Sequence, residues 1–484
     1  MIRSSQRRRQ PPSETSQLKV PHPSSHSADA IFKLLISQLA NNQTLIVMRG
    51  ALDTLIKIMA ASSAAPLNTE SCEILCNAVG CLTNLATNDD NKDKIARSGA
   101  LLPLTELALS DDLRVQRNAT GAILNMTHSA ENRMHLVAAG AVPVLVRLLN
   151  SPDYDVQYYS TTSLSNIAVD SNHRKLLAAT EISVTNNLIR LTDSPSLKVQ
   201  CQATLALRNL ASDDFFQLEI VKYNGLTSLH HLLQSRIPQI VLAAVACIRN
   251  ISIHPANESP IVAANFLPPL LDLLSIDNHE IQCHTMSTIR NLASSDENKR
   301  KIFEAGAVEK MAELLRLKDG ILDDAVKSEM TACLSILALL DEVKPTLYKS
   351  IKYLIRLATT ARNMDVKTNA AIAIGNAATN LEDATGVAVF LKYWKDIRKY
   401  IVEFLSSSDA SLRHIAVWTL VQFVHGNDQL KMKVASDQQL VQVIRDIARE
   451  LFLEEDASIA GNSLLAGASS AEELSQTLLL ELGH

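Results

Sequence analysis

Long apolar runs, aromatic side chains and an excess of basic residues are all lacking from this chain of 484 residues. No run of apolar residues approaches the roughly 20 that a membrane-spanning helix needs. The N-terminal segment also has no apolar stretch of the kind that signal peptides carry. Aromatic residues are only 4% of the chain, and the formal net charge is −5. We therefore expect a protein on the cytosolic side of membranes that does not bind nucleic acid.

Motifs of enzymes and of metal sites are lacking as well. The sequence has no phosphate-binding glycine loop, no His-x-x-x-His pair and no nucleophile-elbow serine. The cysteines follow a repeat: Cys76, Cys201 and Cys283 each precede a recurring asparagine by eight residues, and Cys81 and Cys247 precede one by three. This pattern favours small residues in helix packing over metal ligands. We expect no catalytic residue, metal or cofactor, and no enzyme activity.

The feature that the chain does contain is an asparagine that returns about every 41 residues near the end of a short apolar motif. The separations between successive copies are 41, 41, 43, 41 and 41 residues. The six copies read CLTNLAT, AILNMTH, SLSNIAV, ALRNLAS, CIRNISI and TIRNLAS, with Asn84, Asn125, Asn166, Asn209, Asn250 and Asn291. A period of roughly 40 to 47 residues in helical segments is typical of armadillo and HEAT repeats. The sequence predicts an all-α, right-handed armadillo-repeat superhelical solenoid of about nine repeats.

Each repeat is predicted to contain a short helix, a second helix and a longer third helix that carries the asparagine. Asp, Ser and Asn in the loops before the third helix supply its N-terminal cap. A glycine follows the first helix, where we expect the positive φ that lets one helix end and the next begin. These glycines are Gly50, Gly99, Gly140, Gly225 and Gly306.

We divide the chain into four segments. Residues 1–27 are predicted to be a disordered tail in which five basic side chains and one acidic side chain give a net charge of +4. This tail is either simply solvated or weakly attracted to an anionic membrane surface. Residues 28–452 form the armadillo array, and residues 453–469 form a linker. Residues 470–484 are predicted to be an amphipathic helix that starts with a capping box of Ser470 and Glu473. The sequence leaves open whether this helix docks on the array or is detachable.

The six asparagines are candidate partner-binding residues. Stacked third helices lie about 10 Å apart, so the asparagines would form a row roughly 50 Å long. An asparagine amide can both donate to and accept from the backbone of an extended peptide. The alternative is that these side chains bond only to neighbouring loops of the protein itself.

The residue just before each asparagine is the candidate for specificity. Along the row this position holds Thr83, Leu124, Ser165, Arg208, Arg249 and Arg290. Three arginines on consecutive repeats predict a basic patch that binds an extended segment bearing Asp or Glu. The alternative is internal salt bridging to acids such as Asp213 and Asp214.

The residue four positions before the asparagine argues against nuclear-import cargo recognition. Importin-α-like armadillo proteins carry tryptophans there, and these form slots for the stems of lysine side chains. In this chain the position holds Gly80, Gly121, Thr162, Leu205, Ala246 and Ser287, and only Trp418, near the end of the array, is a tryptophan in the matching place.

The repeats closely resemble those of the fungal vacuolar armadillo-repeat proteins, the vacuole-surface adaptors of yeasts. The strings CNAVGCLTNLAT, VQRNATGAILNMTHS, CQATLALRNLASD and EIQCHTMSTIRNLASS carry the resemblance, which extends from about Thr44 to Asp446. It implies a scaffold on the cytosolic face of the vacuole. The implied partners are a nuclear-envelope protein at nucleus–vacuole contacts, an autophagy-initiation subunit and the myosin adaptor of vacuole inheritance, and the implied roles include vacuole fusion. A three-arginine row that holds partner segments in the family falls on Arg208, Arg249 and Arg290.

The chain departs from this family at its start. Family members begin with Met-Gly and nearby cysteines that carry lipids, whereas this sequence begins MIRSSQRRRQ and its first cysteine is Cys72. We therefore expect peripheral membrane association together with a cytoplasmic pool. Self-association through the first repeat stays open. The competing function is that of a catenin-like signalling or nuclear armadillo protein that binds acidic tails.

Overall fold

The computed structural model describes residues 40–62, 69–317, 322–381, 383–455 and 470–483. The predicted tail, the opening of the array and most of the predicted linker lie outside these residues. All regular structure in the described residues is helical, which confirms the predicted all-α class. The chain divides into two compact units, residues 1–182 and residues 183–484, and each is described by itself.

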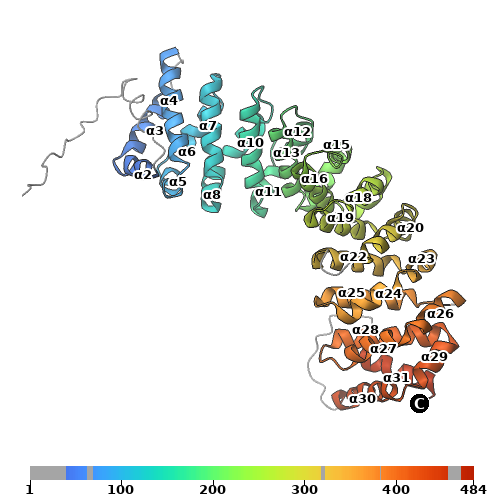
Figure 1. The fold of residues 1–484 in the computed structure, drawn as a ribbon. Coiled ribbons are helices and arrows are strands. Elements are labelled where there is room, and N and C mark those ends of the chain that lie inside the picture. Colours follow the sequence, from blue (N-terminus) through green and yellow to red (C-terminus); the bar gives the residue numbers. More distant parts are fainter. Residues whose placement is uncertain (1–39, 63–68, 318–321, 382, 456–469, 484) are drawn as a thin grey trace, which may run out of the picture. The chain divides into compact units, whose positions relative to one another are not determined.

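Unit 1 repeats the predicted order of helices. Its third helices are α4, α7 and α10, which pack side by side in that sequence (Figure 1). The helices of unit 1 are α2 (Ala40–Met48), α3 (Ala51–Ser62), α4 (Thr69–Leu85), α5 (Asp89–Arg97), α6 (Leu101–Leu107), α7 (Leu113–Met126), α8 (Ala130–Ala138), α9 (Ala141–Leu148), α10 (Tyr154–Ile167) and α11 (Ser171–Ala178).

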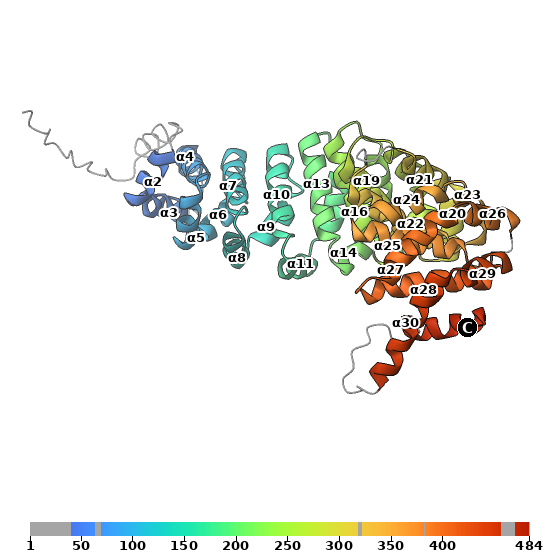
Figure 2. The same ribbon diagram turned by 60° about the horizontal axis from the view of Figure 1, so that its bottom comes forward.

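Unit 2 continues the same pattern. Its third helices α13, α16, α19, α22, α25 and α28 each pack on the next one (Figure 2). The helices are α12 (Val184–Leu191), α13 (Leu197–Leu210), α14 (Asp214–Lys222), α15 (Gly225–Leu232), α16 (Pro238–Ile251), α17 (Pro255–Ala263), α18 (Leu267–Leu273), α19 (His279–Leu292), α20 (Asp296–Glu304), α21 (Ala307–Leu315), α22 (Asp324–Leu337), η1 (Asp341–Val343), α23 (Lys344–Tyr348), α24 (Ile351–Thr360), α25 (Met364–Ala377), α26 (Ala384–Lys392), α27 (Trp394–Leu405), α28 (Ala410–Gly426), α29 (Asp428–Ala435), α30 (Gln438–Glu455) and α31 (Ala471–Leu482).

The predicted loop chemistry sets where the third helices begin. Asp112 precedes α7, and its Oδ1 accepts the backbone N–H groups of Arg114 and Val115 at 2.8 and 3.4 Å. These bonds satisfy backbone donors that have no partner inside the first turn of a helix. Asp153 before α10 and Asn278 before α19 cap in the same way.

The glycine prediction holds at four positions and is wrong at Gly225. Gly50, Gly99, Gly140 and Gly306 have φ angles of 83°, 83°, 77° and 85°. In the remaining repeat Asn224 takes the positive φ, 59°, one residue earlier, because asparagine tolerates the left-handed region better than other non-glycine residues. Gly225 instead opens α15. A Cβ there would lie 2.7 Å from Ile220 Cγ2, so its glycine is needed for close packing.

The core lies between the helices of each repeat and those of its neighbours. On α7, Val115, Ala119, Ile123 and Met126 are fully buried at helical spacing, as expected for the face that packs inward. The first helices add a buried asparagine to the core. Asn257 on α17 donates to Gln217 O and to Ile251 O, both at 3.1 Å, and so ties its helix to the preceding repeat.

The C-terminal helix α31 docks on the array. Its capping box is present as predicted: Glu473 N–H donates to Ser470 Oγ at 3.2 Å, and Ser470 N–H donates to Glu473 Oε2 at 3.0 Å. The helix packs on α28 and α30 and buries Ser475 and Leu478. It therefore takes the place that the third helix of a further repeat would occupy on α28.

Candidate partner-binding site

The recurring asparagine lies near the C-terminal end of each third helix and joins that helix to the third helix before it. In most repeats its Nδ2 donates to the carbonyl of the residue that precedes the asparagine one repeat earlier. These bonds are Asn125 to Thr83 O at 3.1 Å, Asn250 to Arg208 O at 3.1 Å, Asn291 to Arg249 O at 3.5 Å and Asn376 to Ser335 O at 2.8 Å. Asn166 donates instead to Thr127 Oγ1 at 2.8 Å. One donor of each of these five amides thus holds neighbouring third helices in register.

The other side of several amides stays available. All six predicted asparagines are partly exposed, three in unit 1 and three in unit 2. The Oδ1 atoms of Asn125, Asn166 and Asn291 accept no hydrogen bond from any described residue. They can therefore accept one from the backbone N–H of a bound segment. Hydrogen bonding within the protein therefore uses the Nδ2 of these three amides and leaves their Oδ1 available.

The three predicted arginines lie on consecutive third helices of unit 2, but their surroundings differ. On α19, Arg290 Nη1 forms an ion pair with Glu329 Oε2 at 3.1 Å. On α16, Arg249 Nη1 donates to the Oδ1 of its neighbour Asn250 at 3.2 Å. On α13, Arg208 is exposed, and it forms no ion pair with any carboxylate in the part of the chain that the structure describes.

This difference follows from one position of the next third helix, seven residues before the asparagine or its equivalent. The position holds Glu329 on α22, His284 on α19 and Ala243 on α16. Only the glutamate carries a negative charge that offsets the arginine of the preceding helix. The charge of Arg290 is therefore partly offset within the protein, whereas Arg249 and Arg208 have no such ion pair among the described residues.

His284 lies on α19, the third helix that follows the one with Arg249, and it is half-buried. Burial lowers the pKa of His284, and the charges of Arg208 and Arg249 lower it further, whereas Glu280 acts in the opposite direction. The ring is therefore neutral near pH 7. The charges of arginines on α13 and on α16 thus both act on the His284 ring of α19.

Two polar atoms, one on an arginine of the row and one on the glutamate that pairs with Arg290, lack hydrogen-bond partners. Arg249 Nε and Glu329 Oε2 are buried, and neither has a partner among the described residues. Glu329 Oε2 stays within ion-pair distance of Arg290, so the attraction there is Coulombic without a well-aligned hydrogen bond. Buried polar atoms usually have partners, so the free protein leaves hydrogen-bonding capacity unused at the arginine row.

The predicted internal alternative, pairing with Asp213 or Asp214, does not occur among the described contacts. Asp213 instead caps α14, where its Oδ1 accepts the N–H of Phe215 at 3.1 Å. Glu329 is the internal partner that the fold supplies, and only Arg290 has it.

A hollow of about 450 Å³ opens beside Arg208. Its lining includes Arg208 from α13, Leu242 and Ala246 from α16, and Glu280 and His284 from α19. Asp323, the residue just before α22, also lines it. Ala246 stands where importin-α-like proteins carry a tryptophan. Its small side chain leaves room for Arg208 to extend across α16 and line the same hollow as His284.

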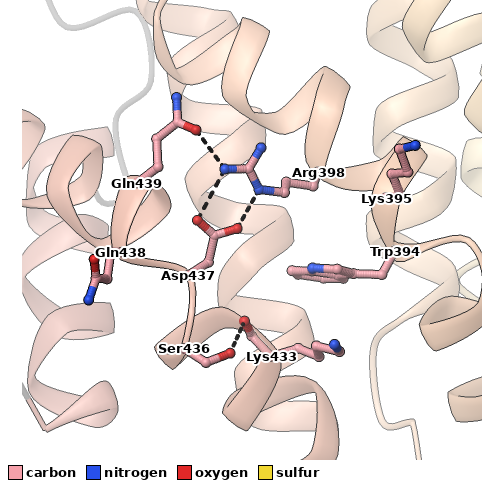
Figure 3. Close-up of a pocket in the computed structure, with 8 residues that line it drawn as sticks. All are labelled: Trp394, Lys395, Arg398, Lys433, Ser436, Asp437, Gln438 and Gln439. Carbon is pink, nitrogen blue, oxygen red and sulfur yellow. Dashed lines mark hydrogen bonds and ion pairs between the residues drawn. The ribbon is translucent and has the colours of Figure 1, made fainter.

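A second hollow of about 550 Å³ lies between α27, α29 and the start of α30 (Figure 3). Its arginine is already occupied, because Arg398 Nη2 lies 3.2 Å from Asp437 Oδ1 and 2.6 Å from Gln439 Oε1. The hydrogen bond to Asp437 raises the pKa of Arg398. Lys395 and Lys433 also line this hollow. None of the predicted partner-binding residues lies there, and the basic stretch LKYWKDIRKY was its only signal in the sequence.

The cysteines have the character of packing residues. Burial raises the pKa of Cys81 and of Cys333 to about 12 in each case, so both thiols stay protonated near pH 7. Among the described side chains, no group of His, Cys, Asp and Glu is arranged to hold a metal ion. No helix in the described ranges has the length and apolar character needed to cross a membrane.

Comparison with protein families supports the repeat assignment. The model of the armadillo/beta-catenin-like repeat matches residues 88–128 and 129–169. These ranges cover α5 to α7 and α8 to α10, which are two complete repeats of the predicted order.

The sequence is similar to proteins named Vacuolar protein 8 from several fungi. It is 53% identical to the Schizosaccharomyces pombe protein over 288 residues, which are 58% of this chain and 51% of that protein. It is 52% identical to the Yarrowia lipolytica protein over 49% of this chain and 42% of that protein. For the Saccharomyces cerevisiae protein the identity is 51%, over 49% of this chain and 41% of that protein. The matches thus span about half the length of these relatives.

Solved structures agree on the fold. An engineered protein matches with a TM-score of 0.74 at 24% identity over 90% of this chain and 99% of its own. A structure that concerns the interaction between cadherin and beta-catenin matches with a TM-score of 0.70 at 18% identity, over 89% of this chain and 82% of its own. These similarities confirm the predicted solenoid fold, and the relatives confirm the resemblance seen in the repeat motifs. The chain has an armadillo-type solenoid fold, two of its repeats match the armadillo/beta-catenin-like model, and its sequence is similar to that of fungal proteins named Vacuolar protein 8.

Proposed function

We propose that this protein is a non-enzymatic scaffold that binds extended, acidic partner segments along its third helices. One observation carries the proposal: Arg208 and Arg249 lie on adjacent third helices that pack on each other, are at least partly exposed, and form no ion pair with any carboxylate of the described chain. Guanidinium groups bind carboxylates strongly because they combine full charge with a planar set of donors. A partner carboxylate would supply what this pair of arginines lacks.

The asparagines give the proposed site its preference for an extended chain. The bonds from Asn250 and Asn291 to the carbonyls of Arg208 and Arg249 fix the backbone from which each arginine side chain extends. An accessible Oδ1, as on Asn291, can then accept a backbone N–H of the partner without reading its side chain. The arginines would select the acidic residues.

The proposed place of action is the cytosolic face of the vacuolar membrane, as a peripheral protein with a cytoplasmic pool. It rests on the similarity to proteins named Vacuolar protein 8. The proposed partners are a nuclear-envelope contact protein, an autophagy-initiation subunit and a myosin adaptor. The corresponding roles are nucleus–vacuole contacts, autophagy, vacuole inheritance and vacuole fusion.

The test is a pull-down of partners from fungal lysate with three forms of the full chain. These are the wild type, the triple variant Arg208→Ala, Arg249→Ala, Arg290→Ala, and a matched control, Arg147→Ala, Arg236→Ala, Arg316→Ala. The control removes the same charge from exposed arginines outside the row. We expect partners that the wild type and the control retain and that the triple variant loses. Equal recovery by all three forms would refute the proposed site.

A further inference from the structure

The hollow beside Arg208 carries charges of both signs. Arg208 supplies the positive side, and Glu280 and Asp323 supply two carboxylates. The three residues come from α13, from α19 and from the residue before α22, so the carboxylates lie on repeats further along the array than the arginine. An acidic segment alone would meet attraction at Arg208 and repulsion at the other two residues.

The two carboxylates have no internal cation to balance them. Glu280 and Asp323 are exposed, and neither forms an ion pair with a described Lys, Arg or His side chain. Asp323 does cap a helix, because its Oδ1 accepts the N–H of Ala325 at 2.8 Å at the start of α22. Its other carboxylate oxygen remains available to a ligand.

The rest of the lining is largely apolar, together with His279 and His284. Leu242, Ala246 and Ala325 contribute hydrocarbon surface, and Cys283 contributes a thiol whose pKa is raised by burial, so that it stays protonated. A lysine or arginine side chain suits such a hollow, because its methylene stem can pack on the apolar part while its charged head reaches the carboxylates.

We infer that this hollow is a specificity subsite for a basic residue of the partner, placed a few residues from the acidic residue that Arg208 binds. The inference rests on the proposed function, because it requires an extended acidic segment along the third helices. It adds that acidic residues in the partner segment are not enough for preferred binding. The preferred segment also carries a Lys or Arg whose side chain lies against Glu280 and Asp323. It also fixes the order of the two charges along the array, since the basic residue must lie towards α22.

The test uses a random peptide library of about 15 residues, a length that spans the asparagine row at roughly 3.3 Å per residue. The library is selected on the full-length wild type, on Glu280→Gln, Asp323→Asn and on a matched control, Glu304→Gln, Glu309→Gln. Asparagine retains the capping role of Asp323, so the double variant is expected to keep its fold. The binding constant of one selected peptide, and of the same peptide with its basic residue changed to Gln, is then measured on each protein.

On the wild type and the control we expect selected peptides with Lys or Arg at a fixed offset from Asp or Glu. Changing that basic residue to Gln should weaken binding about tenfold. On the double variant the offset preference should vanish and the two peptides should bind alike. If acidic peptides bind without any fixed basic residue, or if the preference survives in the double variant, the inference is overturned while the proposed function stands. If no acidic peptide binds the wild type, the proposed function fails as well.

Discussion

The third helices of the two units share the recurring asparagine and differ in the residue just before it. In unit 1 Asn125 donates to Thr83 O at 3.1 Å, and in unit 2 Asn250 donates to Arg208 O at the same distance. The backbone bond is therefore independent of the side chain on the residue that supplies the accepting carbonyl. That side chain is Thr83 in one unit and Arg208 in the other. The comparison separates a structural clamp, common to both units, from the proposed recognition element, which lies only in unit 2.

The largest expected effect comes from reversing the recognition element. The variant Arg208→Glu, Arg249→Glu should weaken binding of an acidic peptide selected on the wild type by about 100-fold or more, because attraction becomes repulsion at two adjacent positions. Helical content and melting temperature should stay unchanged, since both side chains are at least partly exposed. Fluorescence anisotropy and circular dichroism measure the two quantities.

A control with the same charge change outside the row, Arg147→Glu, Arg236→Glu, should retain binding. Comparable losses in both variants would mean that net charge, and not the arginine row, governs recognition.

The clamp can be tested in each unit with the same substitution. Asn125→Ala and Asn250→Ala each remove a hydrogen bond between neighbouring third helices, and each should lower the free energy of unfolding by about 1 kcal/mol. Urea denaturation followed by circular dichroism provides the measurement. Asn250→Ala should also weaken peptide binding because it releases the backbone of Arg208, and the loss should exceed that in Asn125→Ala, which removes an accepting Oδ1 but frees no arginine. A pure binding defect without loss of stability in Asn250→Ala would contradict the clamp.

Within unit 2 the arginines should contribute unequally. Arg208→Ala should weaken binding about tenfold and Arg290→Ala only about threefold, because Glu329 already offsets the charge of Arg290. Conversely, Glu329→Gln should strengthen binding of an acidic peptide. Isothermal titration calorimetry on the three variants ranks them. Equal effects of the two arginine variants would show that the ion pair with Glu329 does not limit Arg290.

The smallest expected effect is a pH dependence through His284. Its pKa is lowered in the free protein by burial and by Arg208 and Arg249. A bound carboxylate offsets those charges and raises the pKa of His284, so binding takes up protons and affinity should increase about threefold as the pH falls from about 7.5 to about 6. Protein stability should change in the opposite direction, because the unfolded chain takes up the proton first as the pH falls below the ordinary value of about 6.5.

His284→Gln should abolish this pH dependence, and His231→Gln, an exposed histidine on α15, should preserve it. A pH profile that is unchanged in His284→Gln would assign the dependence to another group.

Much of the architecture could be predicted because the same local pattern recurs in many repeats. The asparagine spacing, the Asp and Asn caps and the capping box at Ser470 depend on residues close together in the chain. Gly225 shows the limit of such reasoning, since Asn224 meets the same backbone requirement. The buried polar positions also carry a periodic signal: Asn91 and Asn132, and Asn257 and Asn298, recur at separations of 41 residues and are buried on the first helices.

The charges around the arginines could not be predicted in the same way. Glu329, Glu280 and Asp323 approach the row only because third helices stack. Glu329 occurs at its position in a single repeat. Asp323 belongs to the recurring caps of the third helices, but that pattern does not reveal that it shares a hollow with Arg208. Once the position seven residues before the asparagine is known to approach the preceding arginine, Glu329 and His284 can be located from the sequence. The docking of α31 likewise depends on contacts with α28 and α30 that span tens of residues.

The one interval of 43 residues in the asparagine series has a structural counterpart. The two additional residues lie between the starts of α11 and α12, which are 13 residues apart, whereas the starts of α8 and α9 are 11 apart. The division between the two units falls in the same connection, after Ile182. Every arginine of the row and every residue that lines the hollow beside Arg208 is encoded after that point. Cutting the chain at this connection would therefore separate two roles. The C-terminal part would hold all residues of the proposed charge recognition, and the N-terminal part would hold three of the asparagines without the arginines.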